Sequence, residues 1–141
     1  MSYTKMAKSG LKVPKSVKNV DPIMTISIMG NDFKVYLHTR KHLNKIVSDC
    51  EAFMHFERKE IRFSEENHPL NIIVHELIHC FIAGTYIHEL TELEKDDFEE
   101  VVCEVVSNNY VKLYNLAKKV KRGITEELIK RREENDKVKA K

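Results

Sequence analysis

Five residues, His-Glu-Leu-Ile-His at positions 75–79, constrain this chain more than any other feature. Residues four apart on an α-helix lie one above the other on the same face, so the imidazoles of His75 and His79 can reach a single metal ion. Glu76 lies about 100° around the helix from His75 and about 60° from His79. It can therefore reach a water beside the ion without being a ligand. The pattern predicts a helix that presents a metal-binding pair.

The helix that carries this pattern is apolar on nearly every side. Its apolar residues are Ile72, Ile73, Val74, Leu77, Ile78, Cys80, Phe81 and Ile82. We therefore expect a buried central helix. Burying two imidazoles and a carboxylate without partners costs roughly several kcal/mol. The alternative to a metal site is a pair of core histidines that are satisfied by hydrogen bonds.

A second helix supplies acids that could complete such a site. Residues 96–107 have apolar residues at helical spacing, and Glu100 and Glu104 share one face of that helix. A catalytic zinc ion has three protein ligands and one open position, so a glutamate could complete the histidine pair and a second acid could orient a ligand. By themselves these acids indicate a solvated face, because residues 89–104 hold eight acids and one lysine.

Two segments, HELIH at 75–79 and EEVVCEVVS at 99–107, resemble those of the gluzincin zinc metallopeptidases. The small size and the order of segments resemble the minimal gluzincin-type domains of phages and mobile elements, over residues 23–120. The resemblance implies a Zn²⁺ cofactor held by His75, His79 and Glu100, with Glu104 orienting a ligand histidine. In the family an Asp or Asn often follows the ligand Glu, whereas here a Glu occupies the corresponding place. Glu99 and Glu104 therefore stay open as alternatives to Glu100.

The implied activity is hydrolysis of peptide bonds in a peptide or protein substrate. Glu76 would be the general base, taking a proton from the attacking water and passing it to the leaving amine. Related enzymes add a Tyr or His that donates to the oxyanion, and Tyr86, His88 and Tyr110 are the candidates. The alternative function is a catalytically inactive zincin-like binding or regulatory module.

The remaining patterns predict two β-hairpins and several helices. The predicted elements are strands 23–29 and 33–37, a helix over 40–50, strands 52–56 and 60–63, the zinc helix from Pro69 to Gly84, the glutamate helix to about Lys121 with a stop at Gly123, and a last helix from Thr125 to about Lys137. The expected fold is α+β and zincin-like. A small antiparallel sheet packs on the zinc helix, and the glutamate helix crosses from the other side.

Strand 60–63 runs directly into the zinc helix, so we expect it to form the edge of the sheet beside the cleft. An extended peptide can bind such an edge by strand addition. Arg62 would then lie near the substrate. The alternative, to which we give equal weight, is that Arg62 is an ordinary exposed residue of the strand.

Composition and charge set the domain limits. The chain has 141 residues, 42% of them hydrophobic, which supports one domain over 21–123 between a basic arm (1–20) and a charged C-terminal helix or tail (124–141). The arm holds five lysines, no acid and no interleaved aromatic run, so it predicts a solvated tail and no nucleic-acid partner. Without a long apolar stretch or a signal peptide we expect a cytoplasmic protein that has no membrane contact. Oligomeric state is left open.

Overall fold

The computed structural model describes residues 20–47, 49–84 and 95–141, so nearly all of the basic arm, together with Tyr86 and His88, lies outside the described residues. The elements in chain order are β1 (Met24–Ile28), β2 (Asn31–His38), α2 (Arg40–Asn44), β3 (Ala52–His55), β4 (Glu60–Ser64), α3 (Leu70–Gly84) and α4 (Lys95–Lys139). The α+β class is confirmed. Within these ranges no helix is both long and apolar enough to cross a bilayer.

Both predicted hairpins are present. In the first, Ile28 pairs with Asn31 across a two-residue turn formed by Met29 and Gly30. These two residues have φ values of 51° and 74°, and two successive positive φ angles are typical of a type I′ turn, whose twist matches that of the flanking strands. In the second hairpin, β3 and β4 are antiparallel.

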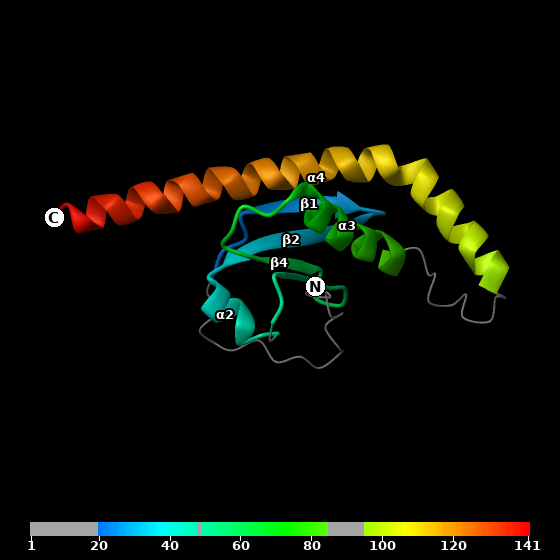
Figure 1. Cartoon of the computed structure of the whole chain (residues 1–141), viewed down its shortest axis with the longest axis horizontal. Helices are drawn as coiled ribbons and strands as arrows, with labels where there is room; N and C mark the ends of the chain where they lie inside the picture. Colours follow the sequence, from blue (N-terminus) through cyan, green and yellow to red (C-terminus); the bar gives the residue numbers. More distant parts are fainter. Residues whose placement is uncertain (1–19, 48, 85–94) are drawn as a thin grey trace.

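The sheet is mixed, so the prediction of a wholly antiparallel sheet is wrong. Strand order is β1-β2-β4-β3, and β4 runs parallel to β2 with Lys34 opposite Glu60 and His38 opposite Ser64 (Figure 1). Strand 60–63 is therefore internal, and among the described residues the outer strands are β1 and β3. Pairing within a hairpin is local. Which strand of one hairpin pairs with which strand of the other is decided by how both hairpins pack on the helices.

One face of the sheet carries the main core. Its buried sheet residues are Ile26, Ile28, Phe33, Val35, Leu37, Ala52, Met54, Ile61 and Phe63, and the helix residues packed on them are Ile73, Leu77, Cys80, Phe81, Leu113, Ala117, Val120 and Ile124. Both long helices thus cover the same face, with α4 beside α3 (Figure 1). Each fully buried aliphatic side chain contributes about 1.5–3 kcal/mol.

Helix α4 runs without interruption through Gly123, so the predicted helix end at this residue is wrong. A Cβ at Gly123 would lie 3.1 Å from Sδ of Met24, so a larger residue here would require the Met24 side chain of β1 to shift by a few tenths of an ångström. Just beyond it, Ile124 is 1% exposed. Further along, Arg131 donates a 3.1 Å hydrogen bond to the carbonyl oxygen of Leu37. The helix therefore stays docked on the domain past Gly123.

We expect Ile124→Ala to lower the free energy of unfolding by about 2–4 kcal/mol, because it leaves a cavity in the main core. The matched control is Ile129→Ala on the same helix, where Ile129 is 51% exposed and the loss should stay below about 1 kcal/mol. Urea unfolding followed by circular dichroism measures both. Equal, small losses would mean that the second half of α4 is not docked.

The opposite face of the sheet holds a buried charge network instead of a substrate-facing arginine. Arg62 is 3% exposed. Its Nε and Nη2 donate to Glu60 at 3.2 and 2.9 Å, and its guanidinium carbon lies 4.2 Å from the ring centroid of Tyr36. Leu43 of α2 and Phe53 belong to a second buried cluster at this face. Arg62 is thus neither near an edge nor exposed, and both expectations for it are wrong.

His38 completes this network in its neutral form. Nη1 of Arg62 lies 2.7 Å from Nε2 of His38, and since a guanidinium can only donate, Nε2 accepts and the proton is on Nδ1. The side chain is 1% exposed. Burial first, and then the positive charge of Arg62, lower the pKa of His38 to about 4. The folded protein therefore resists protonation of this ring.

This lowered pKa makes stability dependent on pH. In the unfolded chain His38 takes up a proton near pH 6.5 and in the folded chain near pH 4, so its contribution is complete above pH 6.5 and is lost as pH falls towards 4. The loss should reach about 3 kcal/mol. His38→Gln keeps an acceptor for Arg62 and should flatten the melting temperature over this range, whereas Lys41→Gln should not. Parallel pH curves for His38→Gln and the parent would contradict the assignment.

Candidate metal centre

Helix α3 presents the two histidines of the motif on its solvent side. Leu77 is fully buried, and His75 and His79 lie about 160° around the helix from it. His75 is exposed and His79 is partly buried. Their Nε2 atoms are 3.1 Å apart, and their ring centroids are separated by 4.7 Å. The prediction that both imidazoles share one face of a helix is confirmed.

The spacing of these nitrogens fits two positions of a tetrahedral metal site. Two nitrogen ligands about 2.0–2.1 Å from one zinc ion lie about 3.3–3.4 Å from each other. Burial, and next the charge of His75, lower the pKa of His79, which favours the neutral imidazole that binds metals. The same spacing also suits a hydrogen bond between one protonated and one unprotonated ring nitrogen. Metal content distinguishes the two arrangements.

Glu76 lies on the inner side of α3 and is fully buried. One turn further on is Cys80, whose thiol pKa is raised by burial and by the negative charge of Glu76, and lowered to a smaller extent by the positive charge of Lys59. Lys59 belongs to the β3–β4 turn, has φ 53°, and holds its Nζ 3.2 Å from the ring centroid of Phe56. The proposed base therefore sits in a charged, enclosed environment and not beside the imidazoles in solvent.

The structure does not bring an acid of α4 to the histidine pair. Glu99, Glu100 and Glu104 are all exposed, and in the described ranges no three His, Cys, Asp or Glu side chains form a group that could hold a metal ion. The two helices run in opposite directions (Figure 1).

At the start of α3, Nζ of Lys121 donates to the carbonyl oxygen of His68 at 2.6 Å. The first turns of α4, which carry the three acids, bend away from the line of the rest of the helix (Figure 1).

Helical phase distinguishes the three acids further. Measured from the buried Leu113, Glu99 lies about 40° around α4, Glu100 about 140° and Glu104 about 180°. Val102 and Val106, which are partly buried, share the side of Glu99. Of the three acids, Glu99 therefore projects most nearly in the direction of the packed side of α4.

Of the proposed proton donors to the oxyanion, only Tyr110 is described. It is 50% exposed and stacks on Tyr114, with ring centroids 5.8 Å apart. The sequence offered no sign that Lys59 lies close enough to Cys80 to act on its thiol. Lys59 reaches this place because the second hairpin packs on α3.

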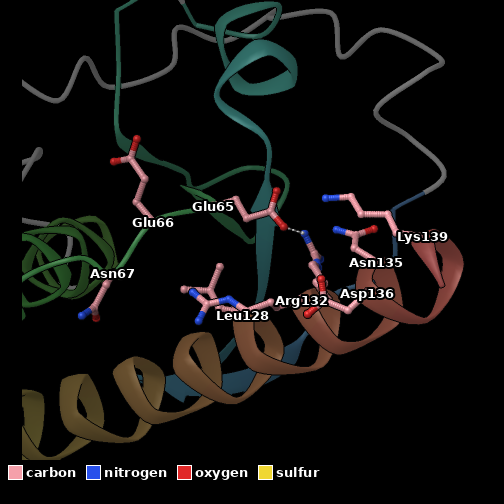
Figure 2. A pocket seen from close by; sticks show the side chains of 9 residues that line it. Glu65, Glu66, Asn67, Leu128, Arg132, Asn135, Asp136 and Lys139 are labelled. Atoms are coloured by element: carbon pink, nitrogen blue, oxygen red, sulfur yellow. Dashed lines mark hydrogen bonds and ion pairs between the residues drawn. The ribbon is translucent and has the colours of Figure 1, made fainter.

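A separate surface hollow of about 410 Å³ lies between the loop before α3 and the end of α4 (Figure 2). Glu65 comes from the loop, and Arg131, Arg132, Asp136 and Lys139 come from α4. Arg131 is 3.5 Å from Glu65 and 2.8 Å from Glu127, so its charge is balanced within the protein. With acids and bases interleaved, this hollow indicates no particular ligand.

Comparison with known proteins gives no relative: no family model, no curated protein and no solved structure matches this chain. The chemistry of this site therefore has to be argued from its own residues.

If the histidine pair binds zinc only in the folded state, zinc should raise the melting temperature, with about 2.7 kcal/mol of added stability at a hundred times the dissociation constant. His75→Ala and His79→Ala should each remove this gain. His42→Ala, a histidine of α2 far along the chain, is the control and should keep it. A parent protein whose melting is indifferent to both zinc and chelator would indicate that the two rings are joined by a hydrogen bond.

Proposed function

We propose that this protein is a zinc-dependent peptidase in which His75 and His79 hold the ion and Glu76 acts as the general base. The observation that carries the proposal is the pair of Nε2 atoms, 3.1 Å apart on the solvent side of α3. The neutral state favoured for His79 adds to it. A zincin-like arrangement, with α3 packed on the sheet and followed by an acid-bearing helix, is part of this proposal.

The third ligand in the proposal is Glu100, as the resemblance implies, with Glu99 as the alternative that helical phase favours. Either residue has to approach the histidine pair from the start of α4. Metal binding would therefore be coupled to a rearrangement of the first turns of that helix, as occurs when a site is completed only on binding. Residues 113–124 need not move, since their contacts lie in the main core.

Zinc in this place supplies a Lewis acid and a water of lowered pKa. The chain's own part is to move the proton. Glu76 accepts it from the attacking water and returns it to the leaving amine. Because Glu76 is fully buried, a water has to be admitted to the inner side of α3 for this step. Tyr110 is the described candidate for donation to the oxyanion.

An extended substrate cannot add to residues 60–63, because β4 has a neighbouring strand on both sides. Strand addition would have to use an outer strand of the sheet, β1 or β3 among the described residues. This changes the expected position of the peptide while leaving its chemical class the same.

The second candidate is a zincin-like binding or regulatory module without catalysis. Two observations favour it: no described acid joins the histidine pair, and the carboxylate of Glu76 is enclosed. A zinc-containing protein without peptidase activity would support this alternative.

We expect Glu76→Gln to retain zinc and lose hydrolysis of a mixed peptide library by about 10²-fold or more, because the base is removed and the ligands are kept. Elemental analysis and mass spectrometry of the peptides measure the two effects. Zinc loss in Glu76→Gln would show that this residue is a ligand, and its assignment as the general base would be wrong.

The third ligand is identified by a matched series of Glu99→Ala, Glu100→Ala and Glu104→Ala, all exposed positions within two turns of one helix. One of the first two should lose zinc, because removal of a protein ligand weakens the site. Full occupancy in all three variants would show that α4 contributes no ligand.

A further inference from the structure

Independently of any hydrolysis, we propose that the outer face of α4 between Tyr110 and Arg122 binds single-stranded nucleic acid. The first observation is a segregation of charge along the helix. Residues 105–125 contain five Lys or Arg and no acid, in a chain that has 22 acids among 141 residues. The acids of α4 lie before and after this segment.

Four of these cations point away from the domain. Lys112, Lys118, Lys119 and Arg122 are exposed and lie about 100–180° around the helix from the buried Leu113. The described sheet and α3 lie on the other side of α4 (Figure 1). These four side chains lie within the eleven residues 112–122, or about 15 Å of helix, on one continuous face.

The fifth cation serves the fold and is excluded from the site. Lys121 donates to Oδ1 of Asn67 at 3.2 Å and to the carbonyl oxygen of His68 at 2.6 Å. The outer four have no such anchoring role in the fold, and of these only Lys118 has a ring contact, to Tyr114. Their charges are thus presented to solvent.

An aromatic row lies next to the basic one. Tyr110 is 50% exposed and stacks on Tyr114, and Nζ of Lys118 lies 4.9 Å from the ring centroid of Tyr114. Val111, at 67% exposed, adds apolar surface. A ring with one face open can stack a nucleobase, while lysines one and two turns further along meet the phosphates.

This combination selects single strands over other anions. In a duplex the faces of the bases are stacked on one another, so the exposed ring of Tyr110 would contribute nothing. An acidic protein segment would use the cations and leave the ring unused. The sequence had predicted no nucleic-acid partner because the N-terminal arm lacks interleaved aromatics, but α4 has both kinds of side chain on adjoining strips.

The test uses the full chain and fluorescein-labelled 12-nucleotide DNA and RNA single strands, with anisotropy measured between 50 and 200 mM salt. Four cations on phosphates should give a slope of log affinity against log salt near −3, since each contact with a single strand contributes about −0.7. The duplex of the same sequence should bind more weakly. Absence of binding at 50 mM salt, or tighter binding to the duplex, overturns the proposal.

Variants locate the surface. Lys118→Glu with Arg122→Glu should weaken binding by roughly tenfold or more and flatten the slope. The control, Lys34→Glu with Lys45→Glu, makes the same change in net charge at exposed positions of β2 and at the end of α2, outside α4, and should lose much less. An equal loss in both double variants would mean that only net charge matters, and the site would be wrong.

Variants of Tyr110 distinguish base stacking from electrostatic attraction to the phosphates. Tyr110→Ala should cost about 5- to 100-fold in affinity, whereas Tyr110→Phe keeps the ring and should bind like the parent. Unchanged binding by Tyr110→Ala would refute the stacking platform. Sedimentation without nucleic acid shows whether the protein self-associates. If it does, and if the double variant Lys118→Glu, Arg122→Glu abolishes the self-association, the face binds an acidic segment of a second copy and the proposal is wrong.

Discussion

The apolar face of the four-stranded sheet, packed against α3 and α4, is the contact on which the rest of the molecule depends. Leu77 of α3 and Val120 of α4 are fully buried in this contact. Once they are buried, helical periodicity decides what each helix turns to solvent. On α3 the outward residues are the two histidines of the motif. On α4 they are the row of cations. Both candidate surfaces thus follow from the burial of a single core.

Two buried charge networks lie on either side of the sheet. On the far side from α3, Arg62 is paired with Glu60 and hydrogen-bonded to a neutral His38. On the near side, the carboxylate of Glu76 lies close enough to Cys80 to raise the pKa of its thiol. Charges removed from water are stable only when other groups compensate them. In the first network Nδ1 of His38 is buried and has no hydrogen-bond partner among the described residues. The second involves the carboxylate of Glu76, which is fully buried on the inner side of α3.

The path of α4 couples the metal centre to the fold. Gly123 lets β1 approach closely, and Lys121 holds the start of α3, so the second half of the helix is held in place by packing and hydrogen bonds. In the described ranges no acid of α4 forms a three-ligand group with the histidine pair. A site that needs one of them is therefore completed by movement at one end of a helix whose other end is anchored.

The sequence by itself determined the local elements: the hairpins from alternation around turn residues, the shared helix face of the histidine pair from its i, i+4 spacing, and the approximate limits of α3. These depend on interactions between residues close in the chain. Only the tertiary structure decided that β4 lies between β2 and β3, that Arg62 is buried with His38, and that Gly123 is a packing site within a helix. Each of these depends on which segments far apart in the chain become neighbours. The same holds for the level of Glu100 relative to His79, because spacing along one helix cannot set its register against another.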